Sequence, residues 1–145
     1  MSKIKSFRGL MADGEQQEIA LSTNNGMTGY RIVKFQVLDD EPGEAESANA
    51  IKIYKILQSS VTGKIDFSDN TLLAAIDFRQ HNNEAYGVSA NTIIVDNEIF
   101  NQDIYITNKA NTGSASMNYY IELEAMDLAL DEQTVATLKD IRNTN

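Results

Sequence analysis

Apolar and polar side chains alternate along much of the middle of this chain. The clearest run covers residues 119–126, where every second position is apolar and two glutamates stand between the apolar positions. A period of two is that of a β-strand with one buried face. We therefore predict a strand that buries Tyr119, Ile121, Leu123 and Ala125 and turns Glu122 and Glu124 to water.

Other segments carry the same signal in shorter runs that are rich in β-branched and aromatic residues. They cover residues 18–21, 30–38, 51–57, 72–78, 92–95 and 104–107. In the second run the alternation predicts that Val33, Phe35 and Val37 share the buried face. In the third run it predicts that Ile53 faces the core and Lys52 faces the opposite side.

Polar turn clusters separate these runs at residues 24–26, 81–84 and 112–114, and no helical pattern lies between the strands. Seven or eight short strands joined by polar turns are typical of an antiparallel sandwich or barrel, whereas alternating βα units are excluded. We therefore predict a mainly β chain, an antiparallel β-sandwich of jelly-roll or Greek-key type with a short C-terminal helix.

The helix is predicted over residues 131–142. Val135, Leu138 and Ile141 lie three positions apart, which places them on one helical face, and Asp131 suits the N-terminal cap. Because so short a helix is marginal alone in water, we expect this face to dock on the chain's own sandwich or on a neighbouring subunit.

Length and composition narrow the class of protein. The 145 residues, 42% of them hydrophobic, fit one domain that folds without a disulfide or a metal. Cysteine is absent, which fits assembly in a reducing cytoplasm. The formal charge of −9 disfavours direct binding to nucleic acid, and no apolar run has the length of a membrane helix.

Charge is distributed unevenly along the chain. Lys3, Lys5 and Arg8 give the first eight residues a charge of +3, which leaves −12 for the remainder. The predicted domains are a basic N-terminal arm over residues 1–15, a β-sandwich over residues 16–130, and a helix and tail over residues 131–145. The arm either frays in solvent or docks on an acidic neighbour, with Ile4 and Phe7 as apolar anchors.

Candidate chemistry is sparse. His81 is the only histidine and stands in a polar stretch without partners for a catalytic triad or a zinc site. Glu122 and Glu124 have the spacing of a paired-carboxylate site, but a water-facing strand gives the same pattern. Residues 39–46 hold five carboxylates around the only proline, and calcium binding there is an open alternative. We therefore predict no enzymatic activity and no cofactor.

Six segments carry a resemblance that covers nearly the whole chain. They are residues 7–14 (FRGLMADG), 29–35 (GYRIVKF), 65–73 (IDFSDNTLL), 99–107 (IFNQDIYIT), 118–124 (NYYIELE) and 135–143 (VATLKDIRN). In this order and spacing they resemble small structural proteins of marine tailed bacteriophages, of the cyanophage and pelagiphage kind.

The resemblance implies a virion component, and first of all a capsid decoration or cement protein. Such a protein is a compact β-rich homo-oligomer, with a trimer favoured, that assembles in the host cytoplasm. It sits on the exterior of the phage head, binds the major capsid protein through termini and loops, and stabilises contacts between capsid subunits. It needs no membrane and no direct contact with nucleic acid.

Partner binding is then expected at the two ends of the chain, at Lys3, Ile4, Lys5, Phe7, Arg8, Val135, Leu138 and Ile141. Removal of residues 1–8 is expected to abolish particle binding and to leave the fold intact. Two alternatives stay open. One is a neck, tail or fibre-attachment component of the virion, and the other is a carbohydrate- or calcium-dependent adhesion module.

Overall fold

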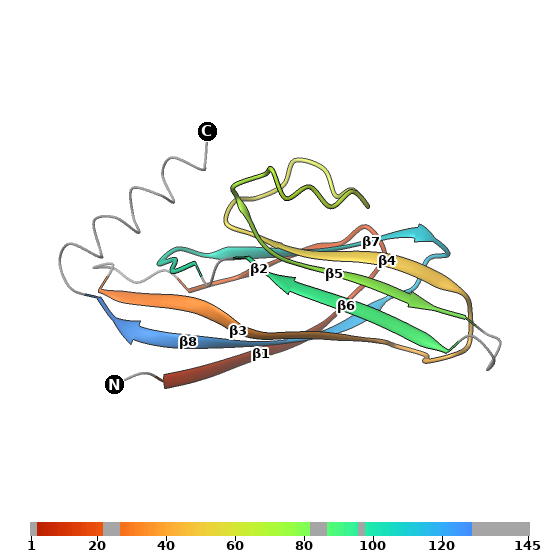
Figure 1. Cartoon of the computed structure of the whole chain (residues 1–145), viewed down its shortest axis with the longest axis horizontal. Helices are drawn as coiled ribbons and strands as arrows, with labels where there is room; N and C mark the ends of the chain where they lie inside the picture. The colour runs from red at the N-terminus through yellow and green to blue at the C-terminus, as the bar shows by residue number, and fades with distance from the viewer. Residues whose placement is uncertain (1–2, 22–26, 82–86, 96–97, 129–145) are drawn as a thin grey trace.

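A computed structural model describes residues 3–21, 27–81, 87–95 and 98–128. The strands within these ranges are β1 (Lys3–Met11), β2 (Gln16–Ile19), β3 (Thr28–Asp39), β4 (Ser47–Tyr54), β5 (Leu72–Gln80), β6 (Val88–Ile94), β7 (Ile104–Thr112) and β8 (Met117–Asp127). They form an antiparallel three-stranded sheet in the order β1-β8-β3 and an antiparallel five-stranded sheet in the order β2-β7-β4-β5-β6. The two sheets lie over one another as the layers of a sandwich (Figure 1). The prediction of a mainly β, two-sheet chain is confirmed.

The core lies between the two sheets, and β8 supplies its central row. Tyr119, Ile121, Leu123 and Ala125 are all buried, which confirms the alternation predicted for this strand. The same core holds Met11 from β1 and several isoleucines from the five-stranded sheet. Each layer therefore needs the other to cover its apolar face.

The alternation predicted for β3 is wrong at one position. Phe35 and Val37 are buried as expected, but Val33 is 38% exposed and Ile32 takes the inward place. The pairing of β3 with β8 shifts its register between Ile32 and Lys34. A β-bulge inserts one extra residue into a strand, so the inward and outward positions exchange on one side of it.

The prediction for β4 is also wrong, because both faces of this strand are buried. β4 lies in the middle of the five-stranded sheet, and the segment between β4 and β5, residues 55–71, crosses the outer side of that sheet (Figure 1). Ile53 is fully buried as predicted, but the side chain of Lys52 is also only 1% exposed. Its ammonium group donates to the backbone oxygen of Lys64 at 2.5 Å and lies 3.4 Å from the hydroxyl of Thr62.

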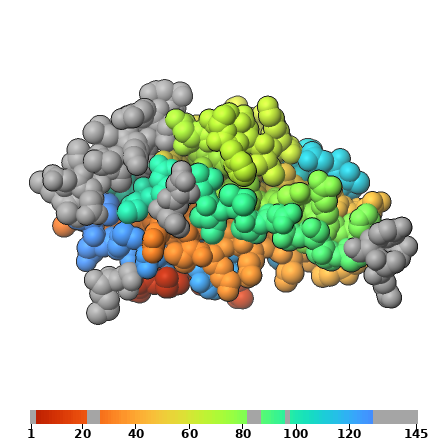
Figure 2. Space-filling view, viewed as in Figure 1, coloured from red at the N-terminus to blue at the C-terminus, as the bar shows by residue number. Residues whose placement is uncertain are grey.

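The two sheets are linked along one side and at one end. β6 lies alongside β3 (Figure 2), and the two strands are in contact although no β-ladder joins them among the described residues. At the end, the backbone amides of Tyr30 and Phe100 each donate to the other residue's carbonyl oxygen at 2.8 Å. The helix predicted over residues 131–142 lies outside the described residues. Within the described ranges, no helix is long and apolar enough to span a membrane.

Candidate interaction surface

The segment expected to be an arm forms β1, the edge strand of the three-stranded sheet. It pairs with β8 over its full length, from Lys3 opposite Ala125 to Met11 opposite Met117, without a shift of register. Among the described residues, no strand pairs with the other side of β1. The boundary expected at residue 15 therefore differs from the structure, in which β1 is part of the sandwich.

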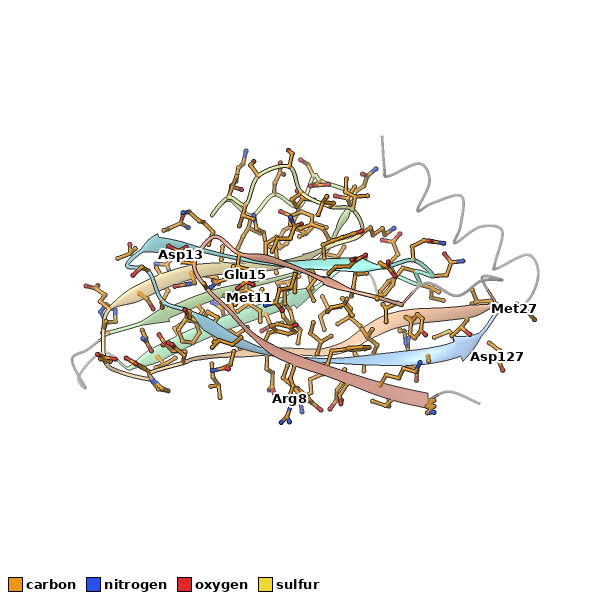
Figure 3. The ribbon with its side chains drawn as sticks, turned by 180° about the vertical axis from the view of Figure 1, so that it is seen from behind. Arg8, Met11, Asp13, Glu15, Met27 and Asp127 are labelled. Carbon is orange, nitrogen blue, oxygen red and sulfur yellow. The ribbon has the colours of Figure 1, made fainter. Side chains whose placement is uncertain are left out.

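A tight turn at residues 12–15 fixes the C-terminal end of β1 (Figure 3). Gly14 has a φ of 83°, which favours glycine, and its amide donates to the carbonyl oxygen of Asn108 at 2.7 Å. The carboxylate of Asp13 accepts the amide of Ala110 at 2.8 Å, and that of Glu15 accepts the amide of Ala12 at 2.8 Å. These bonds tie the turn to β7, so β1 enters the sandwich in a fixed direction.

The two faces of β1 both mix apolar and polar residues, and this is why its sequence shows no period of two. Met11 is buried in the core, and Phe7 packs against it. Gly9 stands where the ring of Tyr119 crosses the strand, since a Cβ there would lie only 2.8 Å from the phenolic oxygen. Arg8 projects from β1 away from the five-stranded sheet (Figure 3). The charged residues of β1 are evident in the sequence, but its strand pattern is not.

Acidic side chains on the outer face of the three-stranded sheet find partners within that sheet. Glu124 accepts a hydrogen bond from the Nε of Arg31 at 2.7 Å. Glu122 accepts the hydroxyl of Tyr120 at 2.6 Å, and this bond raises the pKa of Tyr120. Both glutamates are partly exposed, in agreement with their predicted outward face. Glu124 therefore has a cross-strand partner on β3, and Glu122 has a partner two positions earlier on its own strand.

The cations of β1, unlike Glu124, have no partner of opposite charge among the described residues. Lys3, Lys5 and Arg8 are exposed, and none of them lies within ion-pair distance of a carboxylate of the described residues. The ammonium group of Lys5 contacts Tyr30, whose hydroxyl lies 3.5 Å and whose ring centroid lies 5.5 Å from the nitrogen. Three positive charges on one edge strand of an acidic chain are thus available to an external acidic partner.

An open groove of about 760 Å³ begins beside Arg8. Arg8 and Leu10 of β1 line it together with Tyr120 and Asn118, which stand opposite them on β8, and with residues of β3, β5 and β6. Leu10 is 50% exposed, and Leu38 on β3, which also lines the groove, is 68% exposed. The groove therefore combines a cation, polar groups and exposed leucines on one surface.

The acidic segment of residues 39–46 joins the two sheets. Asp39 at the end of β3 is buried and accepts a hydrogen bond from the Nε2 of Gln80 at the end of β5. Its Oδ1 also accepts the amide of Glu41 at 2.9 Å. Burial, with the neighbouring carboxyl of Asp40, raises the pKa of Asp39 to about 6. Within the described residues, no group of three or more acidic or histidine side chains is placed to hold a metal ion.

The other candidate residues lie at separate positions. His81 lies on the surface, with its Nδ1 3.4 Å from a carboxylate oxygen of Glu46. Asp66 accepts the hydroxyl and the amide of Ser68 at 2.6 and 2.9 Å, which closes a local turn and lowers its pKa. The predicted partner-binding residues Val135, Leu138 and Ile141 fall outside the described residues.

No protein-family model matches this chain, and no curated protein matches it.

Proposed function

We propose that this chain is a non-enzymatic structural protein of a phage virion, a decoration or cement protein that binds the outer head shell as a homo-oligomer, with a trimer favoured. Its sequence resembles small structural proteins of marine tailed phages. The observation that carries the proposal is the edge strand β1, which presents Lys3, Lys5 and Arg8 without a carboxylate partner among the described residues. Such a surface suits attachment to another protein.

The strand order supports an assembly role. A jelly roll is a long hairpin of eight strands folded over, so that strand 1 meets strand 8, strand 2 meets strand 7, strand 3 meets strand 6 and strand 4 meets strand 5. The ladders β1–β8, β2–β7 and β4–β5 follow this nesting, and β3 contacts β6 at the fourth position. We propose that the sandwich is a jelly roll, an architecture used in viral capsid proteins and also in lectins and cupins.

The charge distribution supports the choice of surface. The chain carries twenty-one acidic against twelve basic residues, so most of its surface repels an acidic partner. Along β1 the sign is reversed, and Ile4 and Leu10 on the same strand are about half exposed. Exposed apolar side chains beside unpaired charges are a composition that protein interfaces use for affinity and orientation.

The number of copies in the virion tests the proposal. Gradient-purified particles are analysed by quantitative mass spectrometry, with the major capsid protein as the internal reference. We expect one copy per capsid subunit, or a simple fraction of that ratio spread over the shell. A handful of copies per particle would contradict the decoration role and favour the neck or tail, and absence from the particle would overturn the virion assignment.

Deletion of residues 1–8 no longer isolates the binding surface. The deletion removes six of the nine residues of β1, and it would uncover one edge of β8 together with the core contact of Phe7. Loss of binding would then follow from damage to the sheet as readily as from loss of the cations. Replacement of Lys3, Lys5 and Arg8 by glutamine keeps the strand and removes only the charge.

A further inference from the structure

We infer that the edge of β1 receives an extended acidic segment of the partner as an additional β-strand. The inference rests on the proposed function, since it names the chemistry of the partner that the surface would bind. The partner segment is a polypeptide, because the groups presented along this edge are the backbone N–H and C=O groups of a strand.

The edge is long enough and regular enough to accept a strand. β1 has nine residues, contains no proline, and keeps an unbroken register with β8. A strand paired on one side only directs alternate backbone groups away from its neighbour. Near the turn, the side-chain amide of Gln17 donates to the carbonyl oxygen of Leu10 at 2.9 Å. With respect to the part of the chain that the structure describes, the open part of the edge therefore extends from Lys3 to Gly9.

The charge of β1 favours pairing with an acidic partner strand over pairing with β1 of a second copy. If β1 paired with β1 of another copy, the two strands would bring six cations together, and like charges across neighbouring strands are unfavourable. Pairing with an acidic strand is favourable instead, because each of its carboxylates would lie beside a cation that has no carboxylate neighbour among the described residues. The edge is therefore selective for acidic segments.

The side chains of β1 define the pattern that such a strand would carry. Directly opposite residues of neighbouring strands lie on the same face of a sheet, where they contact each other. Acidic residues would stand opposite Lys3, Lys5 and Arg8, and apolar residues would stand opposite Ile4 and Phe7. An antiparallel segment with this pattern reads Val-Thr-Glu-Val-Thr-Asp-Val-Asp.

The test adds this peptide, with blocked ends, to the full chain and follows amide hydrogen exchange by NMR. The control peptide carries lysine in place of each acidic residue. We expect the acidic peptide to slow exchange at alternate amides of β1 by at least about tenfold, since these amides gain hydrogen bonds, while the control leaves them unchanged. Equal binding of both peptides, or protection confined to residues outside β1, would overturn the inference.

Two variants separate a charge effect from general damage. Lys3→Gln combined with Arg8→Gln should weaken binding of the acidic peptide by at least about tenfold at low salt. Arg79→Gln is the matched control, because Arg79 is an exposed arginine of the five-stranded sheet whose partner is Asp77 on the same strand. Weakening of similar size in the control, or none in the double variant, would contradict the inference.

The outcome is independent of the test of the proposed function. Failure of the peptide to protect β1, with a copy number that matches the shell, would overturn strand addition and leave the decoration role standing. Protection of β1 by the acidic peptide, with the protein absent from particles, would support strand addition and overturn the virion assignment. Formation of dimers by pairing of β1 with itself, detected by sedimentation and by exchange in concentrated samples, would also overturn the inference.

Discussion

The lysines on and just after β4 and the cations of β1 have opposite surroundings. In the five-stranded sheet, Lys52 is buried beneath residues 55–71 and donates to the backbone oxygen of Lys64, and Lys55, just after β4, is buried in an ion pair with Glu98. In the three-stranded sheet, β1 carries exposed cations that face no carboxylate of the described residues. The first arrangement stabilises the fold, and the second leaves charge available for binding.

The largest difference should come from matched isoleucines of the two sheets. Ile53 on β4 is fully buried, whereas Ile4 on β1 is 53% exposed. Ile53→Ala should lower the free energy of unfolding by about 4 kcal/mol, because it removes buried contacts and leaves a cavity. Ile4→Ala should change it by less than about 0.5 kcal/mol. Urea denaturation measures both, and equal losses would contradict the proposed division between the sheets.

Removal of a carboxylate should give the next largest contrast. Glu98→Ala leaves the ammonium of Lys55, whose side chain is 1% exposed, without its partner, and should cost about 3 kcal/mol of unfolding free energy. Glu124→Ala breaks the pair with Arg31, whose side chain is 38% exposed, and should cost less than about 1 kcal/mol. Denaturation at neutral pH compares them. A larger loss for Glu124→Ala would be inconsistent with the buried role of Lys55.

Asp39 tests the contact at which the two sheets meet. Its pKa is raised to about 6, so the folded chain binds this proton more tightly than the unfolded chain does. The free energy of unfolding should therefore fall as the pH rises from about 4 to about 6, with a slope of up to about 1.4 kcal/mol per pH unit from this group. Asp39→Asn should remove this contribution. Identical pH profiles for the two proteins would refute the assignment.

The smallest effect on stability should come from the cations of β1. Lys3→Gln combined with Arg8→Gln should change the free energy of unfolding by less than about 0.5 kcal/mol, since neither side chain has an ion pair with the described residues. Thermal denaturation measures the change. A loss of several degrees would show that these charges stabilise the sheet, and it would weaken the case for their role in binding.

The sequence predicted the fold class because β8 and most of β3 bury alternate residues. β8 shows this directly, since each residue predicted to face inward is buried. The same reasoning failed at Val33, where a bulge changes the period, and at Lys52, where a covering segment buries the outer face. Both effects depend on contacts between distant parts of the chain, which a local pattern does not contain.

The candidate surface was predicted only in part. The basic character of residues 3–8 was visible in the sequence, and the three cations are exposed on β1. That they belong to an edge strand was not visible, because Lys5, Phe7 and Gly9 do not form an apolar row. The need for glycine at position 9 follows from a contact with β8, because the ring of Tyr119 occupies the space that a side chain would take.

Hydrogen exchange of the assembled particle tests the central claim most directly. The protein is compared free in solution and bound to the phage head, with exchange read by mass spectrometry over peptides from each sheet. We predict strong additional protection in β1 and no change in residues 55–71, which cover the opposite side of the sandwich. Protection of residues 55–71 with β1 unchanged would contradict the account, because binding would then occur through the five-stranded sheet.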